Sequence, residues 1–278
     1  MRPPEVLLVD NGSLAAPAIR RLREIARALA ARIGETVAPV SMLHSSTVDP
    51  VELDGVPAEI LAPALARRVA EGRSDFLVVP LFFGPSSAIT EYLPSVVRAQ
   101  QGKTGPLAVR VAPSLFQPGD PRLAGILAAN VAAVTNAGAA YHPARVALVD
   151  HGSPARAVVA VRDALARQLA EMLGSGYEVA ASSMERRPGP EFAFGEPLLE
   201  SVLRRPGWRD NAVTVAMQFL LPGRHAGPDG DVARIGRAAA EEFPDLRIHT
   251  TPLVGESPAL IDILADRWQS GRESAPLK

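Results

Sequence analysis

Short apolar runs alternate with amphipathic stretches along the whole chain. The first run, 6–9, stops at Asp10 and is typical of a buried parallel strand. Between residues 18 and 33 the apolar positions share one helical face, and Gly34 is a suitable helix stop. The same patterns predict three more strands and three more helices in the first half. The strands are 37–43, 76–83 and 107–112, and the helices are 57–71, 91–101 and 121–135.

The second half repeats this order of elements. Its predicted strands are 146–149, 177–184, 212–220 and 247–251, and its helices are 156–173, 196–203, 231–243 and 258–271. Such alternation implies right-handed crossovers and parallel sheets covered on both faces. We therefore predict an α/β fold with two similar doubly wound four-stranded parallel-sheet domains, 1–140 and 141–278, and a ligand cleft between them. From Gly271 onward we expect a frayed tail.

Two short motifs occur twice, about 140 residues apart, and only the second copies contain histidine. Val-Asp-Asn-Gly-Ser at 9–13 returns as Val-Asp-His-Gly-Ser at 149–153, and the segment 82–88 returns as 219–225. His151 and His225 thus stand where the first half has Asn11 and Ala88. Ligands of doubly wound sheets bind beyond the carboxyl ends of the strands. The second half is therefore predicted to carry the functional site. The first half is predicted to form a wall of the substrate-binding cleft.

Composition narrows the possible functions. The 278 residues are 47% hydrophobic and 21% charged, as in a globular protein, and the net charge of −1 gives no reason to expect nucleic-acid binding. The absence of cysteine excludes disulfides and thiolate metal sites. The start has neither signal-peptide nor membrane-span character, so we expect a cytoplasmic protein without membrane contact. A fused repeat replaces a symmetric dimer, which predicts a monomer.

The two histidines are the main candidates for chemistry. Gly152 permits a tight turn after His151. Ser153 is expected to cap the next helix and to bind substrate there, because a helix start suits an anion. His225 lies in a loop shaped by glycine and proline. Alone, each histidine more often shapes a turn or faces solvent. Together they follow neighbouring strands, and neutral imidazoles both bind transition metals and accept protons. We predict His151 and His225 as catalytic residues and metal ligands.

Charged residues beside the strand ends complete this site. Glu185 follows the second strand of its half and is predicted to act as a carboxylate ligand or proton acceptor; a solvated charge is the alternative. Arginines can grip the carboxylates of an anionic ligand, although each is weak evidence because arginine is common here. The predicted substrate-binding arginines are Arg186, Arg187 and Arg224.

The first half offers mainly structural candidates. His44 and Asn11 follow strand ends there and are predicted to contact substrate as part of the wall. Glu91 is expected at a helix start, where the helix dipole favours a carboxylate. His142 and His249 are interpreted as structural. No P-loop, Gly-x-Gly-x-x-Gly turn or nucleophile elbow is present, so nucleotide-dependent chemistry is not supported.

These motifs, taken in order, resemble the sirohydrochlorin cobaltochelatases and ferrochelatases of cobalamin and sirohaem synthesis, in their two-repeat long form. The second half matches in 146–153, 219–225, 251–253 and 258–260, and the first half in 78–82 and 91–94. The resemblance implies an ATP-independent chelatase that inserts Co²⁺ or Fe²⁺ into a tetrapyrrole. Metal and macrocycle are then both substrates, with no tightly bound cofactor. The family's two metal-site histidines carry over to His151 and His225.

The sequence also departs from that family. Long members often keep the histidines in the first half, where this chain has Asn11 and Ala88. The acidic residue usual soon after the second histidine is missing, and Asp229 and Asp231 are the nearest candidates. A non-catalytic metal or tetrapyrrole carrier on the same scaffold is therefore the main alternative. A metal-dependent hydrolase is another, and the missing signal peptide disfavours a periplasmic-type two-lobed binding protein.

Overall fold

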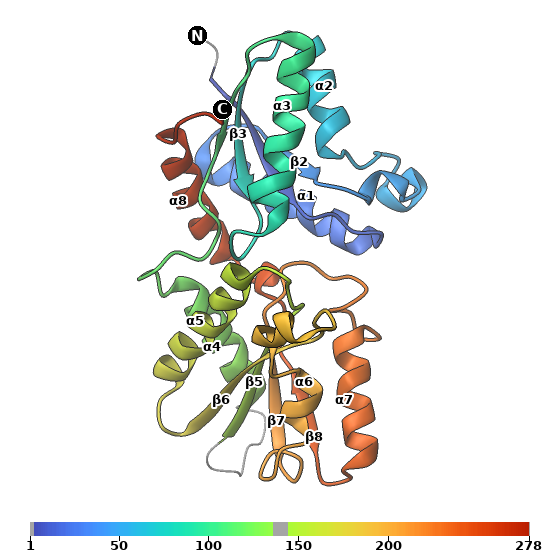
Figure 1. Ribbon diagram of the computed structural model, residues 1–278, viewed down its shortest axis with the longest axis vertical. Helices are drawn as coiled ribbons and strands as arrows, with labels where there is room; N and C mark the ends of the chain where they lie inside the picture. The colour runs from blue at the N-terminus through green and yellow to red at the C-terminus, as the bar shows by residue number, and fades with distance from the viewer. Residues whose placement is uncertain (1–2, 136–143, 278) are drawn as a thin grey trace. The chain divides into compact units, whose positions relative to one another are not determined.

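Two separate four-stranded sheets form the framework of the protein. The computed structural model describes residues 3–135 and 144–277, so the interpretation of His142 lies outside the described residues (Figure 1). Every strand pairing is parallel, and the sheet orders are β2-β1-β3-β4 and β6-β5-β7-β8. The predicted α/β class with two doubly wound parallel sheets is therefore confirmed.

The first compact unit comprises Met1–Pro118 and Pro258–Lys278. Its strands are β1 (Glu5–Asp10), β2 (Val37–Ser41), β3 (Asp75–Pro80) and β4 (Ala108–Val111). Its helices are α1 (Ala16–Ile33), α2 (Leu61–Ala70), α3 (Leu93–Thr104) and α8 (Leu260–Arg272). Helix α1 packs against α8, whereas α2 packs against α3, so two pairs of helices cover the sheet. A π-helical segment, Ala88–Tyr92, leads into α3 and contains Glu91, close to the helix start where it was predicted.

The second compact unit, Gly119–Ser257, repeats this plan. Its strands are β5 (Ala144–Asp150), β6 (Tyr177–Ser183), β7 (Ala212–Met217) and β8 (Arg247–Thr250). Its helices are α4 (Arg122–Thr135), α5 (Arg156–Leu173), α6 (Leu199–Leu203) and α7 (Asp231–Glu242). Helix α4 packs against α5, and α6 packs against α7. The exposed His249 lies within the edge strand β8, as predicted.

The unit boundaries differ from the predicted break between residues 140 and 141. Helix α4 follows β4 in sequence but belongs to the second unit, and α8 follows β8 but belongs to the first. Each unit thus receives its fourth helix from the other half of the chain. Hydrophobic spacing identifies the buried face of a helix, but it does not specify which of two similar sheets that face covers.

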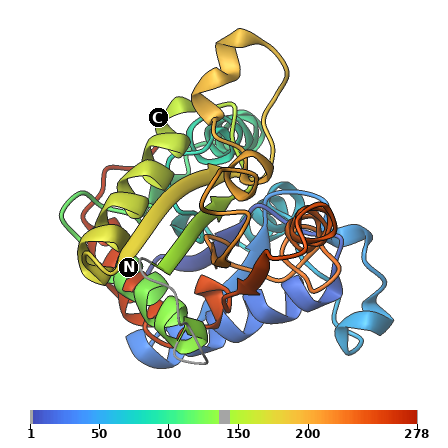
Figure 2. The same cartoon turned by 90° about the horizontal axis from the view of Figure 1, so that it is seen from below.

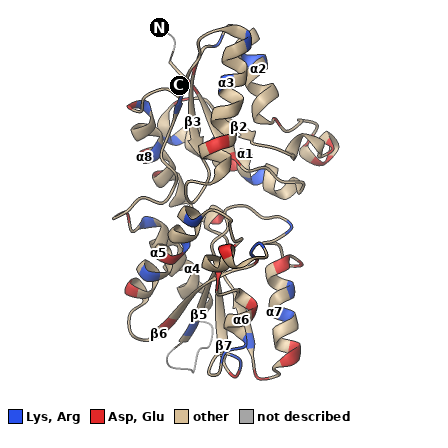
Figure 3. Ribbon diagram, viewed as in Figure 1, with Lys and Arg blue, Asp and Glu red and all other residues tan. Residues whose placement is uncertain are grey.

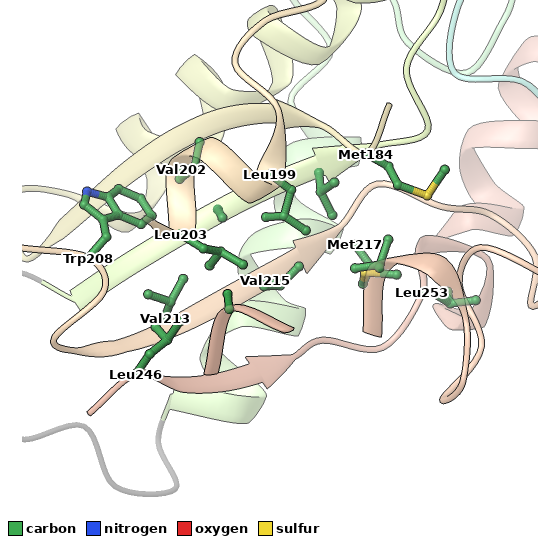
Figure 4. Packing of buried hydrophobic residues seen from close by; sticks show 14 residues of the cluster. Met184, Leu199, Val202, Leu203, Trp208, Val213, Val215, Met217, Leu246 and Leu253 are labelled. Atoms are coloured by element: carbon green, nitrogen blue, oxygen red, sulfur yellow. The ribbon is translucent and has the colours of Figure 1, made fainter. Parts of the chain in front are cut away.

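The core of the second unit extends to the carboxyl ends of its strands. Leu199, Val202 and Trp208 are fully or almost fully buried in it. Met184 and Met217 lie at the other end of this cluster from Trp208 (Figure 4). Because Met217 is the last residue of β7, this end of the core supports the segments that follow the strands.

The predicted frayed tail is wrong. Gly271 is buried within α8, where an added Cβ would lie 2.7 Å from the Cβ of Ala112. Beyond the helix, the Leu277 N–H donates to the Val109 carbonyl at 2.8 Å, and the leucine side chain packs on the core of the first unit. The described residues include no helix with the length and apolar character that crossing a membrane requires.

Candidate metal and substrate site

A tight turn after β5 fixes the backbone of His151. Gly152 has φ of 91°, and a Cβ there would lie 1.9 Å from the Glu185 carbonyl oxygen, so only glycine fits. The Gly152 N–H donates to Asp150 Oδ1 at 3.0 Å. Across the turn, the Glu185 N–H donates to the His151 carbonyl at 3.3 Å. The sequence Asp-His-Gly therefore holds the histidine at the edge of the sheet.

A buried network supports this turn from below. Ser183 Oγ donates to Asp150 Oδ1 at 2.7 Å and accepts from Arg162 Nη1 at 2.6 Å. Arg162 is only 1% exposed. Burial raises the pKa of the Asp150 carboxyl, whereas the Ser183 hydrogen bond and the Arg162 charge oppose that shift. The arginine thus compensates a buried carboxylate that in turn orders the His151 turn.

The loop after β7 positions His225 beside the start of α7. His225 Nδ1 lies 2.5 Å from Oδ2 of Asp231, the first residue of that helix. Asp231 also pairs with Arg234, one turn further along the charged helix α7 (Figure 3). The Val232 N–H donates to the His225 carbonyl at 3.2 Å, which ties the loop to the helix start. Asp231 therefore holds the ring, and the helix holds Asp231.

The two imidazole rings meet edge to face. Their centroids are 4.6 Å apart and their planes are inclined by 75°. His151 Nδ1 lies 3.0 Å from the Gly152 carbonyl oxygen, as His225 Nδ1 lies against a carboxylate. Because these oxygens only accept, we assign the proton to Nδ1 in both rings. The Nε2 atom of each neutral ring then keeps its lone pair, which is the form that binds metals.

A pocket of about 520 Å³ opens beside these rings within the second unit. It is lined by His151, Met184, Glu185, Arg224, His225, Asp231, Arg234 and Ile235. Glu185 Oε1 lies 3.6 Å from His151 Nε2, and its side chain is 62% exposed. The pocket therefore combines imidazoles, carboxylates and guanidiniums over an apolar floor.

The surroundings of His225 favour its neutral form. Partial burial lowers the pKa of the His225 imidazole, and the neighbouring His151 lowers it further. The Arg224 and Arg234 charges act in the same direction, while the Glu185 carboxylate opposes them. A neutral imidazole is available as a ligand near pH 7 without first losing a proton.

The site consists of an imidazole pair, not a complete metal cage. Within residues 3–135 and 144–277, no three or more His, Asp or Glu side chains are grouped so that they can hold an ion. The Asp231 carboxylate is engaged by His225 and Arg234. The Glu185 carboxylate is exposed and lies beside His151 Nε2. An arriving ion would therefore meet two prepared nitrogens and recruit further ligands.

The other predicted residues of the second half fall into different roles. Ser153 does not cap α5, which begins at Arg156; its Oγ accepts from the Ala155 N–H at 3.1 Å. The capping position is instead Ala155, which has no side-chain acceptor. Arg186 is occupied within its own loop, donating to Glu196 Oε1 at 2.6 Å and to nearby carbonyls.

Two arginines of the predicted set remain more accessible. Arg224 lines the pocket with an 83% exposed side chain, 3.9 Å from Asp231 Oδ2. Arg187 is exposed, and its guanidinium lies 5.9 Å from the centroid of the Phe192 ring. Both side chains are placed to meet an anion from solvent.

In the first unit, the positions equivalent to the histidines carry no imidazole. Asn11 is exposed directly after β1, and Ala88 packs against the core at the start of the segment before α3. His44 is also exposed, with φ of 68°, and begins a short 3-10 helix. Nothing in that unit gathers two imidazoles, since Asn11 and Ala88 replace them.

Sequence reasoning missed the buried support of the site. Arg162 lies within the apolar stripe of α5, between Val159 and Leu165. An arginine at such a position signals a buried charge with partners elsewhere, and that signal was present in the sequence. Asp231 was named only as a nearby acidic residue, and Arg234 was not identified, because their contacts depend on how the loop returns to α7.

The chain resembles known proteins in part of its sequence and in its fold. Residues 145–270 match the CbiX family model. This segment contains both histidines and runs from strand β5 into helix α8. No curated protein matches the sequence.

Solved chelatase structures share the fold over the whole chain. SirB from Bacillus subtilis with Fe³⁺ has a TM-score of 0.72 at 14% identity, with 100% of both chains covered. SirB from Bacillus subtilis subspecies spizizenii in complex with cobalt has a TM-score of 0.67 at 14% identity, covering 99% of this chain and 96% of the other. CbiX, the terminal enzyme of sirohaem biosynthesis in denitrifying bacteria, has a TM-score of 0.60 at 18% identity, covering 95% and 98%. These likenesses establish a chelatase-like fold for both units.

Proposed function

We propose that this protein inserts a divalent metal, Co²⁺ or Fe²⁺, into sirohydrochlorin or a related tetrapyrrole without ATP. The observation that carries the proposal is the His151–His225 pair, in which each Nδ1 is held by an oxygen acceptor and each Nε2 lone pair is left for a metal. The CbiX match over the same residues supports it. The solved relatives with Fe³⁺ and with cobalt support the same class of substrate ion.

Metal insertion requires an ion that is held but still released. Two neutral imidazoles are ligands of intermediate softness that suit Co²⁺ and Fe²⁺. The pair can hold the incoming ion while its water ligands leave in steps, and the absence of a closed cage allows transfer. The hydrogen bond with Asp231 fixes the orientation of the His225 ring.

Two pyrrole protons must also leave the macrocycle. Glu185 is exposed at the pocket beside His151 Nε2, so we assign it as the base that takes these protons one at a time, passing the first to water before it accepts the second. Rotation of the same side chain can supply a third ligand before the proton transfer. Arg224 at the rim provides a positive charge for a substrate carboxylate.

The test is a spectroscopic assay of metal insertion. Sirohydrochlorin is mixed with Co²⁺ or Fe²⁺, and the change in its absorbance is followed with and without the protein under anaerobic conditions. We expect a protein-dependent rate for at least one ion, with several turnovers per chain. Binding of the metal or macrocycle with no rate above the uncatalysed reaction would contradict the proposal and support the carrier alternative.

A further inference from the structure

The loop between β6 and α6 carries an unusual set of side chains beside the site. Phe192 and Phe194 belong to a short 3-10 helix, Pro190–Gly195, and their ring centroids are 6.3 Å apart. The guanidinium of Arg156 lies 4.3 Å from the Phe194 centroid, and that of Arg187 lies 5.9 Å from the Phe192 centroid. We call Arg156, Arg187, Phe192 and Phe194 the arginine–phenylalanine patch. Figure 2 shows its loop as the gold segment extending from the second unit.

We propose that this patch binds the carboxylate-rich periphery of a planar tetrapyrrole. The inference rests on the proposed function and assigns the part of the site that recognises the macrocycle. Guanidiniums bind carboxylates through paired N–H groups, and aromatic rings contact flat apolar surfaces. A polycarboxylated macrocycle presents both kinds of surface at once.

The arginines of the patch are not occupied by protein carboxylates. Both are exposed, and among the described residues their contacts are with the phenylalanine rings, with no ion pair or hydrogen bond from either guanidinium. The other acidic groups of the loop are turned elsewhere. Glu196 accepts from Arg186 at 2.6 Å, and the Glu191 carboxylate is directed at Gly189. The two cations therefore remain available to an anion.

The position of Arg156 is unfavourable for helix stability. It is the first residue of α5, where the helix dipole is positive, and the first turn contains no acidic residue. The first residue of the equivalent helix α1 is Ala16, which is buried. Placing a cation at a positive helix end strengthens the attraction for an anionic ligand, which offsets its cost to the helix.

The protein also anchors this loop from within. Arg162 donates to the Gly195 carbonyl at 2.9 Å and to the Glu196 carbonyl at 3.1 Å. The same arginine holds Ser183 and, through it, the Asp150 turn below His151. Arg187 is two residues from Glu185, so their Cα atoms are at most about 7.6 Å apart. The loop of the patch is thus anchored by the same buried arginine that supports the His151 turn.

The equivalent loop of the first unit has the opposite character. Residues 42–60 contain no arginine, lysine or phenylalanine. They include Asp49, Glu52, Asp54 and Glu59 instead. The arginine–phenylalanine patch is therefore a property of the unit that carries the histidine pair, and not of the repeated fold.

The experiment measures equilibrium binding of sirohydrochlorin to the metal-free full chain. The variants are Arg156→Ala, Arg187→Ala and the double substitution, with Arg209→Ala as the matched control. Arg209 stacks on Phe243 at 5.3 Å in the same unit but lies outside the patch. We expect about a three- to tenfold increase in Kd for each single variant and at least about tenfold for the double variant. The dependence of Kd on salt should also weaken in the double variant.

The outcomes separate this inference from the proposed function. Co²⁺ binding should be unchanged in all variants, because the patch contains no proposed metal ligand. The thermal unfolding temperature should not fall in any of them, and Arg156→Ala should raise it slightly because it removes a cation from the positive end of α5. Tight binding by the double variant, or an equal loss in Arg209→Ala, would show that the patch does not bind the macrocycle, while the proposed function would stand. If the unmutated chain does not bind sirohydrochlorin, both are wrong.

Discussion

The two units build the same turn after their first strand but use it differently. Asp10 pairs in register with Ser41, as Asp150 does with Ser183. In the first unit a Cβ on Gly12 would lie 1.8 Å from the Leu43 carbonyl oxygen, almost the distance found at Gly152 in the second. The backbone frame is therefore conserved between the units although the side chains that it presents are not. A repeated fold provides positions, and a few residues decide which copy presents histidines at them.

The differences concern both the ligands and their support. Asn11 and Ala88 replace the histidine pair, and Leu22, at the position equivalent to Arg162, is buried in α1. No arginine lies at that position in the first unit, and Asp10 Oδ1 makes no hydrogen bond among the described residues. The second unit has thus gained a charged network beneath its turn together with the imidazoles above it.

The largest expected effect follows from removing an imidazole. His151→Ala or His225→Ala should reduce the rate of cobalt insertion by more than the ~10–100-fold that follows loss of a group that only orients a ligand. Asn11→Ala, the matched change in the first unit, should leave the rate within about threefold, because a wall contact contributes less than a ligand. The measurement is the sirohydrochlorin absorbance assay with metal content counted per chain.

Two outcomes would contradict the assignment of the metal site to the second unit. Equal losses of rate in Asn11→Ala and His151→Ala would place essential chemistry in the first unit as well. Two bound metals per chain would show a second metal site there. One metal per chain, lost in the histidine variants, is the expected result.

Much of this difference was readable from the sequence. The apolar runs predicted every strand, and helix α5 begins and ends where its pattern indicated. The histidines were found because the repeat set them against Asn11 and Ala88. Local patterns succeed here because strands, turns and helix faces depend on nearby residues.

The remainder depended on tertiary structure. The sequence pattern does not show that α4 and α8 are exchanged between the units, because an apolar helix face can cover either of the two sheets. The role of Arg162 required knowing that the segment at Gly195 returns over α5. Arg156 and Phe194 are almost 40 residues apart, so their contact was likewise invisible to periodicity.

The next largest effect should come from replacing the buried Arg162 by leucine, the residue at the equivalent position of the first unit. Arg162→Leu leaves Asp150, Ser183 and two loop carbonyls without their cation, which should cost about 3–5 kcal/mol of unfolding free energy. The chain has two tryptophans, Trp208 in the second unit and Trp268 in the first. In a Trp268→Phe background, Trp208 is the remaining tryptophan, so urea unfolding followed by tryptophan fluorescence reports on the second unit alone.

A second substitution sharpens that result. Adding Asp150→Asn to Arg162→Leu removes the unpaired carboxylate and should recover part of the loss, giving a coupling energy between the two positions. A loss below about 1 kcal/mol for Arg162→Leu, or simple additivity of the two changes, would show that the network does not compensate Asp150.

The smallest expected effect concerns Asp10, the carboxyl that lacks an arginine. Burial raises the pKa of Asp10 from 3.8 to about 6. The folded unit therefore favours the neutral form, and this contribution to stability is complete below pH 3.8 and lost as the pH rises through about 6. A shift of this size corresponds to on the order of 3 kcal/mol.

Asn is the appropriate test because it is neutral at every pH and close in shape to the protonated carboxyl. In a Trp208→Phe background, where Trp268 reports on the first unit, we expect Asp10→Asn to be about as stable as the parent near pH 4. It should become progressively more stable than the parent between pH 4 and 7, since only the parent must then keep a buried charge. A stability difference that does not change over this range would mean that Asp10 is compensated after all, and that the two units differ in their ligands but not in the support of their turns.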